Sequence, residues 1–228
     1  MTRRVQAVGV VVPARNEEDL LPRALAALEL AARGARQLGV TVDVVVVADS
    51  CLDATAELAR AAGVRVLEAT SGAVGPARAV GALDVLDRHA QVPRDRFWLA
   101  STDADSRVPA QWLLTQLELA DDGADLVLGT VEVDDWSGHP AYVEKAWRAT
   151  YDPHDGHRHV HGANVGVRGD AYLAVGGFPD LDHDEDVALV AALRHRQVVR
   201  TGAIPVLTSA RLQGRAGAGF AGYLADLA

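Results

Sequence analysis

Two carboxylates stand one residue apart, at Asp103 and Asp105, directly after the apolar run of residues 97–101. The run predicts a buried strand, and the carboxylates belong to the loop in which that strand ends. In open α/β sheets, ligands bind at this carboxyl edge. Two carboxylates at this spacing can both offer oxygen atoms to one hard divalent cation, such as Mg²⁺ or Mn²⁺. The alternative for an isolated Asp-x-Asp is a solvated turn, in which aspartate is a favoured residue.

The segments around this loop alternate between strand and helix. Valine-rich runs predict strands buried on both faces, and apolar residues three or four apart predict helices. We expect strands at residues 5–12, 42–47, 65–67, 97–101 and 126–133. We expect helices at residues 20–32, 54–62, 77–89 and 109–120. This alternation predicts a mostly parallel α/β sheet with helices on both faces.

Polar loops follow three of the predicted strands. Pro13 is expected to end the first strand, and Asn16 is expected to cap the helix after it. Asp49 follows the second strand. Because parallel strands end at the same edge of a sheet, the loops of residues 14–17, 49–53 and 103–105 should converge there. This convergence is the first indication of a site.

The pattern is less regular after residue 135. Helices are expected at residues 139–150, 185–193 and 220–227, and short strands at 165–167, 198–200 and 206–208. Residues 151–161, crowded with histidine, aspartate and glycine, predict a loop. We find no repeat and no low-complexity linker, so a single domain over residues 1–228 is expected.

Two basic features have the chemistry to contact phosphate. Arg78 follows Gly75 and Pro76 near a predicted helix start, where it suits a phosphate or nucleotide contact; the alternative is a solvated helix residue. The nearby glycines form neither a Walker A loop nor a dinucleotide fingerprint, which disfavours an ATPase or a classical dehydrogenase. Arg211 and Arg215 lie in a glycine-rich segment suited to closing over a diphosphate, or else to an exposed tail.

Two clusters of ionisable residues each allow two interpretations. The run of residues 183–186 (His-Asp-Glu-Asp) precedes an apolar helical face. Acidic residues there favour the helix dipole, but crowded carboxylates are also how a catalytic base acquires a raised pKa. Four histidines between residues 154 and 161 indicate either a transition-metal cluster or a polar loop over an active site, and their spacing fits no zinc template.

Composition narrows the class of protein. The chain has 228 residues, 49% of them hydrophobic, and a formal net charge of −9. The acidic balance argues against non-specific nucleic-acid binding, which depends on neutralising phosphates. The single cysteine, Cys51, excludes an intrachain disulfide, so we expect a cytoplasmic protein. We expect no secretory leader and no transmembrane segment, whereas peripheral contact with a membrane stays open.

Taken together and in order, seven stretches resemble the GT-A glycosyltransferases, specifically glycosyltransferase family 2. They span about residues 8–220 and are VPARNE (12–17), VADSCLDAT (47–55), GPAR (75–78), TDADS (102–106), HGANVGVR (161–168), GGF (176–178) and EDVAL (185–189). The resemblance implies the GT-A fold, with a nucleotide-sugar-binding half at residues 1–135 and an acceptor and catalytic half at 136–228. It also implies a UDP- or GDP-sugar donor and an unidentified hydroxyl acceptor.

The resemblance assigns a donor site. Its nucleotide pocket is lined by Pro13, Ala14, Asn16 and Glu17, with Asp49 contacting the base and Arg78 assisting. Asp103 would face the ribose or the metal, and Asp105 would hold the Mn²⁺ or Mg²⁺ that bridges the donor diphosphate. The donor sugar and acceptor would border Gly162, Ala163 and Asn164. Arg211 and Arg215 complete the expected donor contacts.

The resemblance also assigns the chemistry. Asp186, with Glu185 beside it, would be the general base that deprotonates the acceptor hydroxyl, and transfer of a hexosyl group would invert the anomeric carbon. The chain departs from the family pattern at Ala79, where an asparagine is usual, and at Ala48, where an aspartate is usual. It also lacks the Gln-x-x-Arg-Trp motif of processive relatives, so a single, non-processive transfer is expected.

Two other functions fit parts of the sequence. Residues 103–106 also resemble the nucleophile motif of haloacid-dehalogenase-type phosphatases, with Asp103 as the nucleophile. That motif normally follows the first strand, whereas here it follows the fourth predicted strand. The second alternative is a non-catalytic sugar-nucleotide-binding protein, which would bind donor with metal and never turn over.

Overall fold

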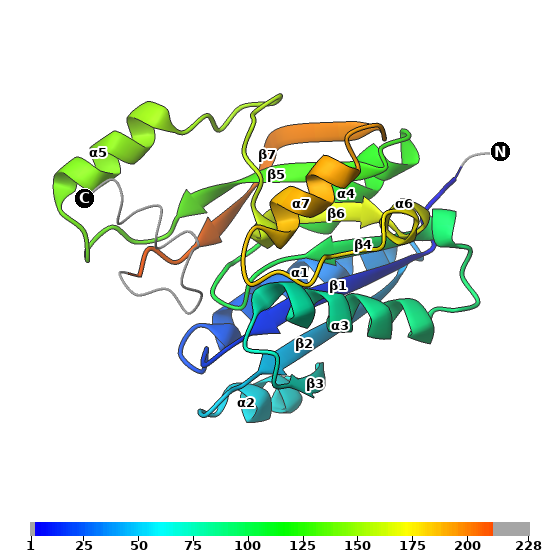
Figure 1. The fold of residues 1–228 in the computed structure, drawn as a ribbon, viewed down its shortest axis with the longest axis horizontal. Helices are drawn as coiled ribbons and strands as arrows, with labels where there is room; N and C mark the ends of the chain where they lie inside the picture. Colours follow the sequence, from blue (N-terminus) through cyan, green and yellow to red (C-terminus); the bar gives the residue numbers. More distant parts are fainter. Residues whose placement is uncertain (1–2, 212–228) are drawn as a thin grey trace.

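The first valine-rich run lies near the middle of a seven-stranded sheet in the computed structural model, which describes residues 3–211 (Figure 1). The strand order is β3-β2-β1-β4-β6-β5-β7. The strands are β1 (Ala7–Ala14), β2 (Thr41–Asp49), β3 (Arg65–Ala69), β4 (Phe97–Ser101), β5 (Leu126–Val133), β6 (Val165–Arg168) and β7 (Val198–Thr208). Strands from both halves of the chain therefore belong to one sheet.

The sheet is mostly parallel, as predicted. Strand β1 pairs in parallel with β2 and β4, and β5 pairs in parallel with β7. The exception is β6, which runs antiparallel to both β4 and β5 and is the reversed arrow between them in Figure 1. All the parallel strands therefore present their carboxyl ends at one edge of the sheet.

Helices cover both faces because β1 is apolar on both sides. Val8, Val10 and Val12 belong to the core beneath α1 and α4, whereas Val11 belongs to the core beneath α3, α6 and α7. Figure 1 shows these two groups of helices on opposite faces. The helices are α1 (Leu21–Gln37), α2 (Thr55–Ala61), α3 (Val74–Arg88), α4 (Trp112–Asp121), α5 (Ala141–Thr150), α6 (Gly169–Ala174) and α7 (Glu185–Ala192).

Helix α3 lies unusually close to the sheet because glycine occurs on both sides of the contact. A Cβ atom at Gly81 would lie 2.5 Å from a methyl carbon of Val11, and one at Gly9 would lie 2.5 Å from a methyl carbon of Val85. Neither distance is sterically tolerable. The two glycines thus allow α3 to pack closely against the sheet. Arg78 lies near the start of this helix, toward the edge of the sheet.

Several expected element boundaries were wrong. Strand β1 continues through Pro13 to Ala14, because the pairing with β4 stops at Val11, where Thr102 donates its backbone N–H to the Val11 carbonyl. Pro13 lies two residues further along the same edge, so its missing N–H costs no ladder hydrogen bond. The two strands expected at residues 198–200 and 206–208 form the single strand β7.

Asn16 does not cap α1. The helix begins at Leu21 with no side-chain cap, because the Asn16 side-chain oxygen accepts a hydrogen bond from the Leu52 backbone N–H at 2.7 Å. The helix expected at residues 77–89 begins earlier, at Val74, with Pro76 in its first turn. The helix expected at 220–227 lies outside the described residues. Over residues 3–211, no helix has the length and apolarity needed to cross a bilayer.

Candidate active site

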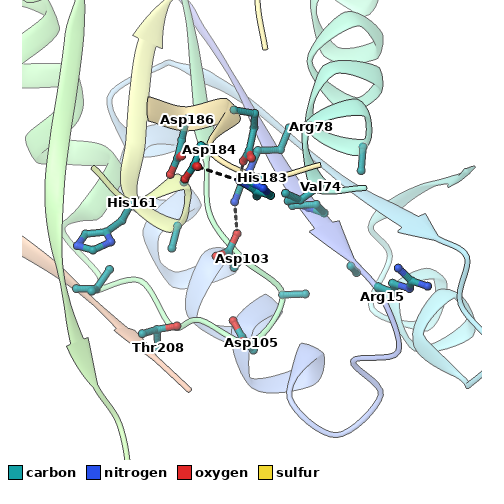
Figure 2. Close-up of a pocket in the computed structure, with 18 of the residues that line it drawn as sticks. Arg15, Val74, Arg78, Asp103, Asp105, His161, His183, Asp184, Asp186 and Thr208 are labelled. Carbon is teal, nitrogen blue, oxygen red and sulfur yellow. Dashed lines mark hydrogen bonds and ion pairs between the residues drawn. The ribbon is translucent and has the colours of Figure 1, made fainter. Parts of the chain in front are cut away.

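The carboxyl ends of β1, β2 and β4 open onto a cavity of about 670 Å³ (Figure 2). Most of the residues singled out from the sequence line it. They are Pro13, Ala14, Glu17, Asp49, Arg78, Asp103, Asp105, Gly162, Ala163, Glu185, Asp186 and Arg211. Asn16 and Asn164 do not line the cavity, and Arg215 lies outside the described residues. The volume suits a small-molecule ligand.

Three loops at the cavity have strained backbones. Asn16, Ser50 and Asp184 adopt left-handed φ angles of 53°, 54° and 60°. Such angles are uncommon outside glycine and occur often at ligand-binding sites. The Asn16 loop and the Ser50 loop are joined to each other, because the Asn16 side chain accepts a hydrogen bond from Leu52. Asn16 therefore shapes the rim and does not line the pocket.

The carboxylate of Asp49 organises the end of the cavity beside β2 and the loop before α3. It accepts hydrogen bonds from the Ser71 hydroxyl at 2.9 Å and from the Gly72 backbone N–H at 3.1 Å. Arg15 donates to the Gly72 carbonyl at 3.1 Å. The loop before α3 is thereby joined to the ends of β1 and β2, and Asp49 keeps its carboxylate at the cavity.

Asp103 and Asp105 follow β4 and both line the cavity, together with Glu17. Arg211 donates to both Glu17 oxygens at 2.7 and 2.6 Å, and it forms an ion pair of 3.0 Å with Asp105. Burial raises the pKa of Asp105 to about 7, and the neighbouring Asp103 charge acts in the same direction. The site therefore concentrates negative charge that a bound cation would offset.

This donor set fits a hard divalent cation. Carboxylate oxygens are the preferred ligands of Mg²⁺ and suit Mn²⁺, and the Arg211 guanidinium already places a positive charge against Asp105. Within residues 3–211, no three His, Cys, Asp or Glu side chains form a ready-made metal cluster. Mg²⁺ is commonly held by one or two carboxylates together with substrate phosphates, so a complete protein cage is not required. The same finding gives no support to a metal cluster among the histidines at 154–161.

Arg78 lines the cavity but is not a solvated helix residue. Its side chain is buried and forms an ion pair of 2.5 Å with Asp103 (Figure 2). A second ion pair joins it to Glu185. Both partners are carboxylates, and both come from other elements. Arg78 therefore forms a bridge between the β4 loop and α7, and its expected nucleotide contact stays a prediction.

The acidic run at residues 183–186 forms the start of α7. Asp186 accepts a hydrogen bond from the Val187 backbone N–H at 2.8 Å, and burial raises its pKa, although the positive charge of Arg78 opposes that shift. A partly buried carboxylate at the cavity has the properties of a general base. Glu185 is only 2% exposed and is paired with Arg78. Its carboxylate is thus engaged in the bridge.

The individual residues that form one wall of the cavity were not predicted from the sequence. Trp147, Tyr151 and His159 stack in sequence, with ring centroids 4.0 and 4.1 Å apart, and all three line the cavity. The Tyr151 hydroxyl accepts from the Val131 N–H at 2.8 Å and lies 3.0 Å from His161 Nε2. Burial lowers the pKa of His161 to about 3, so its ring is neutral near pH 7. The alternating histidines were the available signal, and they belong to a loop at the cavity, as expected.

The expected ligand contact of Asn164 was wrong. Its side chain is 1% exposed and points into the core, where its oxygen accepts from the Trp112 indole N–H at 2.8 Å. Its amide donates to the carbonyls of Thr130 and Ile204, each at 2.8 Å. Asn164 therefore joins α4, β5 and β7 beneath the cavity floor, whereas Gly162 and Ala163 remain in the lining.

Comparison with known families and structures gives a consistent result. Residues 9–172 match the model of glycosyl transferase family 2. No curated protein matched the chain in sequence.

Solved structures share the fold at low sequence identity. The fragment 1–349 of S. aureus TarS is 16% identical to this chain, with a TM-score of 0.63. The match covers 89% of this chain and 60% of the TarS fragment. The longer S. aureus TarS structure is 17% identical to this chain, with a TM-score of 0.64. The match covers 90% of this chain and 37% of the longer TarS chain. The chain thus spans well under two thirds of either TarS structure.

A third relative was crystallised with a nucleotide. Glucosyl-3-phosphoglycerate synthase from Mycobacterium tuberculosis, in complex with Mg²⁺ and uridine diphosphate, is 14% identical with a TM-score of 0.54. The match covers 86% of this chain and 68% of the synthase. At these identities, the likeness establishes the α/β GT-A architecture and leaves substrates undetermined.

Proposed function

The chain belongs to glycosyl transferase family 2, and from that membership we propose that it transfers a sugar from a nucleoside-diphosphate sugar to an acceptor hydroxyl. The proposal extends to a single, inverting transfer of a hexosyl group with a divalent cation. The observation that carries it is the set of carboxylates around one cavity: Asp49, Asp103 and Asp105 at strand ends, and Asp186 on α7.

The donor would lie along the carboxyl ends of β1, β2 and β4. Asp49 would accept a hydrogen bond from the base, and the diphosphate would lie near Glu17, Asp103 and Asp105, all of which line the cavity. Asp105 and Asp103 would hold Mn²⁺ or Mg²⁺, which supplies positive charge against the departing diphosphate. Arg211, already paired with Asp105, is positioned to contact the same phosphates.

Asp186 would act on the acceptor. Its carboxylate takes the proton from the acceptor hydroxyl while that oxygen attacks the anomeric carbon. The diphosphate leaves from the opposite side, so a direct displacement inverts the anomeric centre. Burial raises the pKa of Asp186, which makes its carboxylate a stronger base than that of an exposed aspartate.

A thermal-shift panel tests the donor part of the proposal. UDP-, GDP- and dTDP-sugars are added to the whole chain with and without Mn²⁺, and one nucleotide class is expected to raise the melting temperature only when Mn²⁺ is present. The stabilising donor is then incubated with a panel of sugar and polyol acceptors.

The product decides between the alternatives. Release of a nucleoside diphosphate together with a glycosylated acceptor supports the proposal. Release of inorganic phosphate that depends on Asp103 would favour the phosphatase. Donor binding without product across the acceptor panel would favour a non-catalytic binder.

A further inference from the structure

We infer that Arg78 is a positioning residue, which joins the metal-side carboxylate Asp103 to helix α7 and so fixes Asp186 relative to the donor. The inference rests on the proposed function, because it concerns the alignment of the donor with the base. It differs from a nucleotide-binding role, in which the guanidinium would contact the ligand itself.

Both η nitrogens of the Arg78 guanidinium pair with carboxylates of the protein, whereas its buried Nε has no hydrogen-bond partner among the described residues. One η nitrogen pairs with Asp103 at 2.5 Å and the other with Glu185, so a single planar group bridges two carboxylates. The side chain is 5% exposed and the Glu185 side chain 3% exposed. The Asp103 side chain is 35% exposed, so the pair with Glu185 is the buried one, and removing either of its partners would leave an uncompensated buried charge.

Glycine lets two loops approach the bridge closely. A Cβ atom at Gly162 would lie 2.4 Å from the Arg78 guanidinium carbon, so the guanidinium lies directly against the Gly162 backbone. At the start of α3, a Cβ at Gly75 would lie 2.5 Å from the Leu181 carbonyl oxygen and 3.2 Å from the Cβ of Glu185. The loop before β6, the start of α3 and the start of α7 are therefore packed together around Arg78.

The bridge connects the loop that carries the expected metal ligands with the helix that carries the proposed base. Asp103 is two residues before Asp105 in the loop after β4, and Glu185 is the first residue of α7, directly before Asp186. The Asp186 carboxylate accepts a hydrogen bond from the Val187 backbone N–H in the same first turn of α7, and the nearby Gly162 backbone acts to lower its pKa. Arg78 thus pairs with Glu185, the residue directly before the proposed base, lies against Gly162, and pairs with Asp103 on the expected donor side.

Arginine is required for this geometry. Lysine retains the charge but presents one ammonium nitrogen, which cannot form a planar bridge between two carboxylates. A misplacement of about 1 Å between reacting groups can cost roughly 10²-fold in rate. We therefore expect Arg78→Lys to lower kcat by about 10- to 100-fold while leaving nucleotide affinity within about threefold of wild type.

The experiment compares whole-chain variants with the donor identified for the wild type. Calorimetry measures the affinity for the nucleoside diphosphate with Mn²⁺, and steady-state assays measure kcat and the donor and acceptor KM. Arg88→Lys is the matched control, because Arg88 ends the same helix and pairs with Asp43 at 2.7 Å on the exposed surface. The control is expected to match wild type in both assays.

Glu185→Gln supplies a second, independent variant. It keeps the side-chain shape and removes the charge at the α7 end of the bridge, so it should also lower kcat with little change in nucleotide affinity. Because both variants break one bridge, their effects should be strongly non-additive in the double variant. If Arg78→Lys does not fold, Glu185→Gln alone must show the loss of kcat at unchanged affinity.

Three results would overturn the inference. The first is a nucleotide affinity that falls in parallel with kcat in Arg78→Lys, which would make Arg78 a ligand contact. The second is a kcat within about threefold of wild type in both variants. The third is additive losses in the double variant. A wild-type chain that transfers no sugar would instead refute the proposed function, and the two failures are thus distinguishable.

Discussion

Replacing Asn164 by alanine separates a structural role from a ligand role at the cavity floor. The substitution removes three buried hydrogen bonds of 2.8 Å each, made with the Trp112 indole and with the carbonyls of Thr130 and Ile204. Trp112 is fully buried, so its N–H would be left without a partner and without access to water. We therefore expect a large loss of stability with little direct effect on donor contacts.

The magnitude follows from the groups left behind. An orphaned buried donor costs about 1–3 kcal/mol, and the two carbonyls and the vacated volume add to that cost. We expect Asn164→Ala to lower the free energy of unfolding by about 3–5 kcal/mol, out of a total of roughly 5–15 kcal/mol. For a domain of this size, that corresponds to a fall in Tm of about 10 °C.

Urea unfolding followed by circular dichroism measures the effect, and Asn16→Gly provides the control. Asn16 also uses its side-chain oxygen in a hydrogen bond, but that bond is exposed, and glycine tolerates its φ of 53°. The control should lose about 1 kcal/mol or less. The reasoning would be refuted if Asn164→Ala unfolded like wild type while its affinity for donor fell tenfold or more.

Three further outcomes follow from the site. Asp105→Asn should abolish the Mn²⁺-dependent gain in nucleoside-diphosphate affinity measured by calorimetry, and an unchanged gain would place the cation elsewhere. Burial raises the pKa of Asp186 above its ordinary 3.8, and the base must be ionised to act, so kcat/KM for the acceptor should begin to fall at a pH above 3.8 as the pH is lowered. A pH profile that stays flat down to pH 3.8 would contradict a base at Asp186. Gly162→Ala should cost about 1–3 kcal/mol in urea unfolding, since its Cβ would lie 2.4 Å from Arg78, and wild-type stability would show that the guanidinium can move aside.

The strands that were predicted best are those with strong local signals. The expected bounds of β4 and β5 match the structure, because uninterrupted apolar runs end at polar turn residues. Pro13 was misjudged because the cost of a missing N–H depends on whether a neighbouring strand is there to accept it. The place of β6 between β4 and β5 depends on pairings across dozens of residues, which local pattern does not encode.

The same distinction applies to the site. The carboxylates at strand ends could be placed from sequence, because strand direction alone brings Asp49, Asp103 and Asp105 to one edge. Arg78 and Asn164 could not, because their partners lie far away in the chain: Arg78 pairs with Glu185, 107 residues later, and Asn164 contacts Trp112, 52 residues earlier. Burial of a polar side chain is a long-range property, and here it distinguishes ligand contacts from structural ones.

The central claim is that Asp186 deprotonates an acceptor hydroxyl beside a donor held at Asp103 and Asp105. Its most direct test is acceptor-dependent release of nucleoside diphosphate, compared between wild type and Asp186→Asn with the donor that stabilises the chain. We expect unchanged donor affinity and a turnover lower by about 10²-fold or more in the variant. Turnover of Asp186→Asn close to that of wild type would contradict it.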